Sequence, residues 1–243
     1  MLCTNRTSRG LSNIAVMKID GSDFREVTGG DTVDSAPAWV QGAGSEPAVV
    51  FESTGIARTP QGVMLGYGPT SIQLLDLGRG TLTAVLDDAS YDHLGPRVGR
   101  DGALYFIRRP YESPQYSSGN FLVDVAMFPI RLVRALFHYL NFFSLTYSRK
   151  PLTSASGPLV EADIKELMVK NRKLDAEKAL RDGTRIAGTP SLVPASWELV
   201  RRDQHGQEQT LARHVVAFDL DAADRVVYTN GYGVFSSTAP SSA

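Results

Sequence analysis

The sequence predicts an all-β fold, a partial β-propeller of about three four-stranded blades with an α-helical insertion. Three observations predict this fold. Short β-rich runs recur at intervals of roughly 40–55 residues, within the range of propeller repeats. Glycine or aspartate-glycine turns separate the strands within each unit. Between the second and third units, a long stretch rich in aromatic and charged residues interrupts the pattern.

Three kinds of segment recur in a fixed order. The first is a β-rich run that ends in small polar or basic residues, at 2–6, 49–55, 104–109 and 226–231. The second leads into a turn, at 14–21, 72–80 and 197–206. The third follows that turn, at 24–28, 82–86 and 209–213. Short β-branched and aromatic runs bounded by glycine and aspartate are typical of strands.

The spacing of the first segment locates the insertion. Cys3, Phe51, Tyr105 and Tyr228 occupy matching positions, and subtraction gives intervals of 48, 54 and 123 residues. The last interval is one repeat plus an insertion between Pro110 and about residue 195. We therefore expect a first propeller part at 1–110, a helical insertion at 111–195 and a last propeller part at 196–243. A β-sandwich also has many short strands but would not repeat their order at this period.

Propellers close with four to eight blades, so three are too few. The sequence indicates a segment of a longer propeller. A chain that closes by self-association, or one whose insertion covers the open edges, is the alternative.

Several motifs resemble the repeat of the TolB-like β-propeller family of bacteria. The first unit contains Ile-Ala-Val-Met-Lys-Ile-Asp-Gly (14–21), Val-Thr (27–28), Ala-Pro-Ala-Trp (36–39) and Val-Val-Phe-Glu-Ser (49–53). The second unit matches at Gly-Pro (95–96), Asp-Gly (101–102) and Ala-Leu-Tyr-Phe-Ile (103–107). The third keeps Val-Ala-Phe (216–218) and Val-Val-Tyr-Thr (226–229) but has Ala-Asp-Arg (223–225) in place of the Asp-Gly turn.

This resemblance implies a propeller fold and a non-enzymatic binding or scaffolding role in the bacterial cell envelope. It predicts a protein partner. Residues 1–10 lack the basic start, apolar run and cleavage site of a secretory signal. We therefore expect the cell envelope or periplasm if a leader is missing from this chain, and the cytoplasm otherwise.

The insertion begins with an apolar, aromatic segment at 121–145. Arg131, Arg134, His138 and Asn141 follow helical spacing and form one narrow polar stripe. Pro129 suits the first turn of a helix that runs to about residue 145. The roughly 17 helical residues carry two arginines, whereas a spanning helix needs about 20 mostly apolar residues, so we do not predict a transmembrane segment.

Two interpretations of this helix stay open. It either packs over the propeller as structural cover, or it contacts a protein partner or the membrane surface. The candidate contact residues for the second interpretation are Phe128, Arg131, Arg134, Phe137, Tyr139, Phe142 and Phe143. A second helix is predicted at 160–182, where Ile164, Leu167, Met168 and Leu174 follow helical spacing, although Asn171 and Lys178 interrupt the stripe.

Sequence motifs for catalysis and cofactors are absent. The chain contains no Gly-x-Ser-x-Gly, His-Glu-x-x-His, Cys-x-x-Cys, phosphate-binding or dinucleotide-binding motif. Asp92-His93 is an unlikely catalytic pair because neighbouring residues on a strand point to opposite faces. Asp20, Asp76 and Asp203 recur at turns and are explained by turn chemistry rather than by metal binding. We predict no catalytic residue, cofactor or metal ligand.

The composition agrees with an ordinary globular protein. The 243 residues include 25 basic and 26 acidic side chains, for a formal charge of -1, which disfavours nucleic-acid binding. The single cysteine cannot form an internal disulfide.

Two rival functions remain open at this stage. The propeller is an accessory or gating domain of an enzyme whose catalytic domain is absent from this chain, or it binds a small molecule or glycan in its central channel.

Two structural expectations follow from the repeats. Strands should dominate 1–109 and 196–236. The large apolar residues at matching repeat positions should be buried: Trp39, Phe51, Leu75, Tyr105, Phe106, Phe218 and Tyr228.

Overall fold

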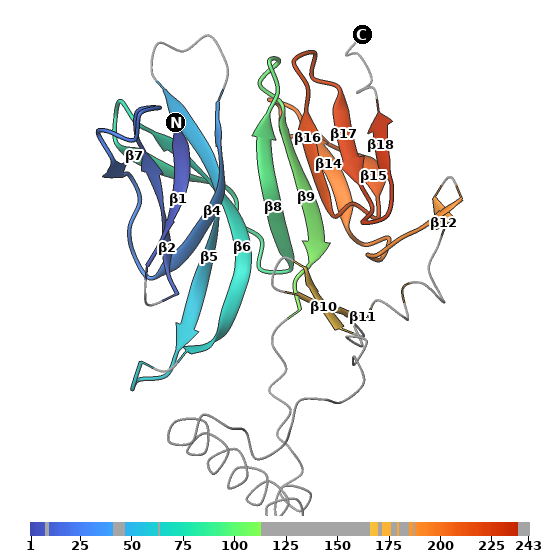
Figure 1. Cartoon of the computed structure of the whole chain (residues 1–243), viewed down its shortest axis with the longest axis horizontal. Coiled ribbons are helices and arrows are strands. Elements are labelled where there is room, and N and C mark those ends of the chain that lie inside the picture. Colours follow the sequence, from blue (N-terminus) through green and yellow to red (C-terminus); the bar gives the residue numbers. More distant parts are fainter. Residues whose placement is uncertain are drawn as a thin grey trace, which may run out of the picture. The chain divides into compact units, whose positions relative to one another are not determined.

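The computed structural model describes residues 1–7, 10–40, 47–62, 64–112, 166–169, 172–175, 179, 185–186 and 188–237. Apart from Ala179, which is helical, the secondary structure in these ranges consists of β-strands, and nearly all strand pairs are antiparallel (Figure 1). The described sheets belong to one compact unit, Met1–Pro114 with Lys165–Ala243. Residues 115–164 form a second unit that lies outside the described residues, and with it lies the predicted helix at 121–145.

The first sheet, sheet A, contains seven strands. In chain order they are β1 (Leu2–Arg6), β2 (Ser12–Val16), β3 (Arg25–Glu26), β4 (Thr32–Trp39), β5 (Ala48–Arg58), β6 (Met64–Asp76) and β7 (Thr81–Leu86). Strands β1, β2 and β3 form one antiparallel part, and β4 to β7 form a four-stranded meander. The two parts meet at one parallel bridge, where Ser12 lies opposite Val33.

The second sheet, sheet B, is also a four-stranded meander, in the order β15-β14-β9-β8. Its strands are β8 (Tyr91–Val98), β9 (Leu104–Pro110), β14 (Glu198–Arg202) and β15 (Glu208–Arg213). Strands β9 and β14 pair over five residues, from Arg108 opposite Glu198 to Leu104 opposite Arg202. They are direct neighbours although the 87 residues 111–197 separate them in the sequence.

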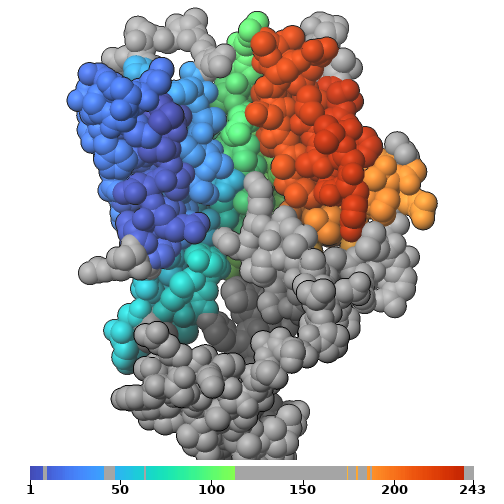
Figure 2. Space-filling model, viewed as in Figure 1, coloured from blue at the N-terminus to red at the C-terminus, as the bar shows by residue number. Residues whose placement is uncertain are grey.

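A third sheet, sheet C, contains β16 (Ala217–Leu220), β17 (Val226–Thr229) and β18 (Val234–Ser237). Figure 2 shows this sheet, in red, beside the green strands β8 and β9. Every strand expected from the repeats is present, so strands dominate 1–109 and 196–236 as predicted.

The helix predicted at 160–182 is wrong for residues 166–169 and 172–175, although Ala179 is helical. Two antiparallel strands occupy it, β10 (Glu166–Val169) and β11 (Arg172–Asp175), with Leu167 opposite Leu174. Asn171 lies between the strands in the sequence, and asparagine favours turns over helix interiors. A further short pair follows, β12 (Arg185–Ile186) with β13 (Thr189–Pro190).

Strands β4 and β8 share one irregularity. Their registers shift between Ser35 and Ala38 and between Leu94 and Arg97. In each case two residues, a left-handed residue and a proline, lie opposite one residue of the partner strand: Ala36 (φ 49°) before a proline, and Gly95 (φ 62°) before another. Proline has no N–H for the ladder, so it is well placed in a bulge. A shared bulge supports the repeat inferred from the sequence.

The core lies between successive sheets. On β9, Tyr105 and Ile107 pack with Val226 of sheet C, whereas Leu104 and Phe106 pack with Ile72 of sheet A. Sheet B is therefore buried on both faces. A third cluster, Ile14, Val49, Phe51 and Leu75, fills sheet A.

The burial predictions hold for most of the chosen residues. Phe51, Leu75, Tyr105 and Phe106 are buried, and Phe218 and Tyr228 pack half-buried against the core. Trp39 was expected in the core but is 41% exposed. It is the last residue of β4 and lies beyond the register shift, which changes the side chains that face inward.

Candidate functional site

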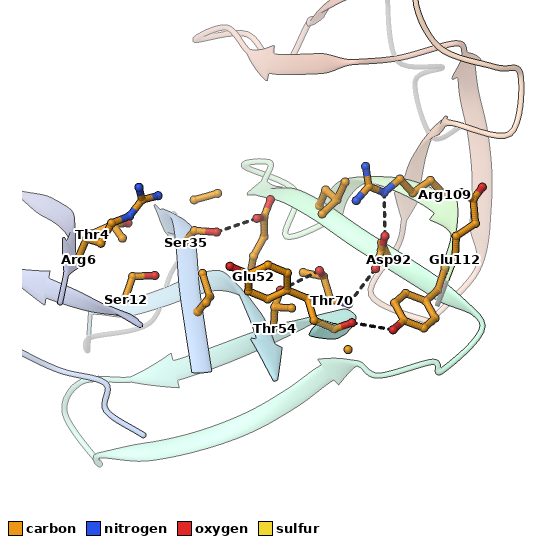
Figure 3. A pocket seen from close by; sticks show the side chains of 16 residues that line it. Thr4, Arg6, Ser12, Ser35, Glu52, Thr54, Thr70, Asp92, Arg109 and Glu112 are labelled. Carbon is orange, nitrogen blue, oxygen red and sulfur yellow. Dashed lines mark hydrogen bonds and ion pairs between the residues drawn. The ribbon is translucent and has the colours of Figure 1, made fainter. Parts of the chain in front are cut away.

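A cavity of about 390 Å³ is lined by residues of sheets A and B. We call it the polar cavity, and its main polar residues are Arg6, Ser35, Glu52, Thr70, Asp92 and Arg109. These side chains come from six strands, β1, β4, β5, β6, β8 and β9, so the site exists only in the folded chain. Figure 3 shows Arg6 on one side, Glu52 and Thr70 in the middle, and Asp92 with Arg109 on the other side.

An ion pair forms one wall of the polar cavity. The Arg109 Nε atom donates to Asp92 Oδ2 at 2.8 Å, and both side chains are about 95% buried, at 5% and 6% exposed. The guanidinium of Arg109 also lies 4.6 Å from the ring centroid of Trp197, which is fully buried. Asp92 Oδ1 accepts the backbone N–H of Thr70 at 3.0 Å. This carboxylate therefore connects β6 of sheet A to β8 and β9 of sheet B.

Glu52 is a second buried carboxylate, on β5. One carboxylate oxygen accepts the Ser35 hydroxyl at 2.9 Å, and the other accepts the backbone N–H of Gly95. Gly95 lies in the bulge of β8, where the register shift takes residues out of the ladder. Because a buried backbone N–H needs an acceptor, the side chain of Glu52 fits this position.

Hydroxyl groups and tyrosines complete the cavity wall. The hydroxyls of Thr54 and Thr70 are 2.8 Å apart and hydrogen bonded, and both residues are buried. The Tyr111 hydroxyl donates to the Tyr67 carbonyl oxygen at 2.7 Å, which fixes the position of the Tyr111 side chain. Both tyrosines are half-buried.

The charges of the polar cavity nearly cancel. Arg6 and Arg109 are cationic, and Glu52, Asp92 and Glu112 are anionic, so these five residues sum to one negative charge. Arg6 is exposed at the end of β1, and its side chain has no hydrogen bond or ion pair to any other described residue. The arrangement combines fixed donors and acceptors with one exposed cation.

A second cavity, of about 320 Å³, contains His93, Tyr91, Asp88, Arg108 and Glu208 among its lining residues. His93 is buried and its ring lies edge-on to Phe106, with 5.4 Å between centroids. Burial lowers the pKa of His93, although Asp88 and Glu208 act in the opposite direction. Asp92 lines the polar cavity and His93 lines this second cavity, so the two side chains face opposite sides of β8, as the strand alternation predicted.

The turn aspartates have the role predicted for them. Asp20, Asp76 and Asp203 each accept backbone N–H groups two to four residues further along the chain. Within the described ranges, no cluster of three or more potential ligand side chains could hold a metal ion. In the same ranges, no helical segment is long and apolar enough to cross a bilayer.

The residues predicted to contact a partner or membrane lie outside the described residues. They are Phe128, Arg131, Arg134, Phe137, Tyr139, Phe142 and Phe143. Sequence analysis did not select the residues of the polar cavity. One signal was available, since Glu52 is the single carboxylate of its strand and directly follows four apolar residues. The others come from different strands, which sequence spacing alone does not bring together.

Comparisons with known proteins give only distant similarities. No family model matches the chain. No curated protein matches it. Hydrazine synthase from Kuenenia stuttgartiensis aligns over 96% of this chain and 35% of its own, at 10% identity and a TM-score of 0.36. Tricorn protease aligns over 97% of this chain and 24% of its own, at 11% identity and a TM-score of 0.36. At this level, neither similarity bears on the function of this protein.

Proposed function

We propose that the chain is a segment of a β-propeller that acts as a non-enzymatic protein-interaction or scaffolding module at the bacterial cell envelope, with residues 121–145 as its contact element. Two features support the propeller. Sheets A, B and C pack face to face in succession, with apolar clusters on both faces of sheet B. The meander of β4 to β7 and the meander of β8, β9, β14 and β15 also have the same bulge in their first strands, β4 and β8.

The pairing of β9 with β14 carries the proposal for the insertion. Sheet B keeps five consecutive residue pairs between these strands despite the 87 residues that separate them. The charged side chains at this point agree with the pairing, because Arg108 bonds Glu198 at 2.9 Å and Glu208 at 2.8 Å. The chain therefore leaves sheet B at the end of β9 and returns to it at the start of β14, its neighbouring strand. Such an insertion adds a surface to a scaffold without changing the scaffold.

The sequence of the insertion supports a contact role. Its narrow polar stripe leaves large aromatic side chains, among them Phe137, Phe142 and Phe143, on the remaining surface. A contiguous apolar surface of this kind marks an interaction site when nothing in the same chain covers it. Arg131 and Arg134 would then lie at the level of phospholipid headgroups or face an acidic partner.

The test compares substitutions in the insertion with a substitution of an exposed phenylalanine that directly precedes β3. Phe137→Glu with Phe142→Glu introduces charge into the proposed contact surface. Phe24→Glu is the control, because Phe24 is a phenylalanine that is 51% exposed in the described part. Flotation with vesicles of phosphatidylethanolamine and phosphatidylglycerol measures membrane contact. Site-specific photo-crosslinking from position 139 in bacterial cells measures protein contact.

We expect the double variant to remain folded by circular dichroism and to lose flotation or the crosslink, while Phe24→Glu retains both. If the unmodified chain neither floats nor crosslinks, the proposed contact role is wrong. If the double variant unfolds, the apolar surface covers the protein's own core and the proposal also fails.

A further inference from the structure

The described part of the chain contains four sheet layers in succession, which are β1–β3, β4–β7, sheet B and sheet C. Apolar clusters join the first layer to the second, the second to the third and the third to the fourth. The first and the last layer therefore each keep one outer face that has no neighbouring sheet among the described residues.

A matched position on β5, β9 and β17 distinguishes a covered face from an outer face. Val50, Tyr105 and Val227 each belong to the second residue pair after the turn from the preceding strand. Val50 and Tyr105 are 3% and 1% exposed, since their faces lie against sheet B and sheet C respectively. Val227 is 39% exposed. Sequence spacing matched Tyr105 with Tyr228, but Tyr228 faces sheet B.

The outer face of sheet C carries mostly small and β-branched side chains. Val234 on the edge strand β18 is 75% exposed and pairs with Thr229, two residues after Val227. The residues of this face are Ala217, Asp219, Val227, Thr229, Val234 and Ser236. The charge of Asp219 is paired with Arg97 of β8 at 2.9 Å. β-Branched residues are typical of a pleated surface that is at least half buried, so this face suits a further sheet.

The outer face of β1–β3 lies at the opposite end of the succession. Ile14 packs onto Val49 of the second layer, so its neighbours Asn13 and Ala15 point the other way. Cys3 pairs with Ala15 and shares this outer face. The residues of the face are Cys3, Asn5, Asn13, Ala15 and Glu26. A sheet that packed here would meet the small side chains of Cys3 and Ala15.

We infer that the outer face of sheet C binds the outer face of β1–β3 of a second copy, so that two copies close a ring of eight layers. The inference rests on the propeller arrangement proposed above and not on the contact role of residues 121–145. Repeat layers bury their faces only against their neighbours, and a second copy continues the interface that already joins successive layers.

The number of layers limits the ring to two copies. Propellers close with four to eight blades, so two copies reach the upper limit and a third would exceed it. Four layers are also within this range, but the exposure of Val227 and Val234 shows that one copy does not close on itself.

The internal interfaces predict which residues would meet in the ring. Tyr105 on β9 clusters with Val226 on β17, so matching strands of adjacent layers face each other. Likewise, Phe51 on β5 packs with Leu2 on β1. In the ring, β17 would face β1 of the second copy. Val227 should then lie close to Cys3 of the partner subunit.

Analytical ultracentrifugation of the full chain tests the number of copies. At about 10–100 µM protein, which saturates an interface with a Kd near 1 µM, we expect a mass near twice 26.4 kDa. Val227→Lys with Val234→Lys places two charges in the interface and should raise the dimer Kd at least tenfold. Leu82→Lys is the matched control, because Leu82 is an exposed leucine on β7 of the second layer. Circular dichroism should be the same for all forms.

Chemical crosslinking tests the arrangement of the copies. Cys3 is the single cysteine, so Val227→Cys gives each copy one thiol on each outer face. A bismaleimide, which adds to two thiols, should link this variant into covalent dimers through positions 3 and 227. Mass spectrometry of the linked peptides identifies the positions. Leu82→Cys is the control and should give no link between positions 3 and 82.

A monomer at every concentration would overturn the inference. So would open chains of mixed length, a dimer that Val227→Lys with Val234→Lys does not weaken, or links that form equally well in Leu82→Cys. Flotation and photo-crosslinking from position 139 measure the contact role of residues 121–145 separately. A monomer would therefore refute the ring and leave that role standing.

Discussion

Removal of one partner of the buried ion pair between Asp92 and Arg109 should destabilise the protein strongly. Asp92→Ala removes the carboxylate and leaves the Arg109 guanidinium in a site where its side chain is 5% exposed. Breaking a buried ion pair by removing one partner costs about 3–5 kcal/mol. The Thr70 N–H also loses its acceptor, at a cost of about 1–3 kcal/mol. The two losses share one carboxylate and are not additive, so we expect at least about 3 kcal/mol.

Urea denaturation followed by Trp197 fluorescence, in the Trp39→Phe background, measures this loss directly. For a chain of this length, 3 kcal/mol corresponds to a fall in Tm of about 6–12 °C. Asp31→Ala is the matched control. Asp31 bonds Arg58 at 3.1 Å, but the Asp31 side chain is 58% exposed. Exposed pairs contribute about 0–1 kcal/mol. Equal losses for Asp92→Ala and Asp31→Ala would refute the reasoning.

Three further predictions concern backbone strain, packing and pH. Ala36→Gly should stabilise the protein by about 0.5–1 kcal/mol, because alanine at φ 49° is strained. Gly95→Ala should destabilise it for the same reason; the urea midpoint should rise in the first variant and fall in the second. Phe51→Ala should cost about 3–5 kcal/mol in the same assay, whereas a loss below about 1 kcal/mol would mean that its ring is not in the core. Burial lowers the pKa of His93, so the folded state favours the neutral ring. Stability should therefore be full above the ordinary pKa of 6.5 and fall as the pH drops below it; in His93→Gln the loss between pH 7.5 and 5.5 should be smaller.

Sequence reasoning predicted the strand pattern because turn chemistry and alternation are local. The Asp-Gly and Gly turns marked where each strand ends, and the matching apolar runs marked the repeats. The same reasoning misplaced Trp39, since a bulge with one extra residue changes the facing of every later residue in the strand. It also predicted a helix where β10 and β11 pair, because Leu167 and Leu174 fit a seven-residue helical spacing and a hairpin equally well.

The polar cavity could not be predicted in the same way. Arg109 is one of two adjacent arginines, and only the fold distinguishes them: Arg108 bonds Glu198 and Glu208, whereas Arg109 turns inward onto Asp92 and Trp197. Likewise, Glu52 receives a hydrogen bond from Gly95, 43 residues later in the chain. Such partners depend on how successive repeats pack, which local sequence does not encode.

The long excursion between β9 and β14 also delays the completion of sheet B during synthesis. A ribosome that adds about 5–20 residues per second needs about 4–17 s to make the 87 residues 111–197. Over that interval, the edge of β9 has no partner strand, because β14, with Leu199 and Val200, has not yet been made. Closing a loop of this length costs about 2.5 kcal/mol more than closing a five-residue turn, by the logarithmic dependence on loop length. For those seconds the newly made chain thus exposes an apolar strand edge with unpaired backbone N–H and C=O groups. A chaperone that binds extended strands could bind this edge.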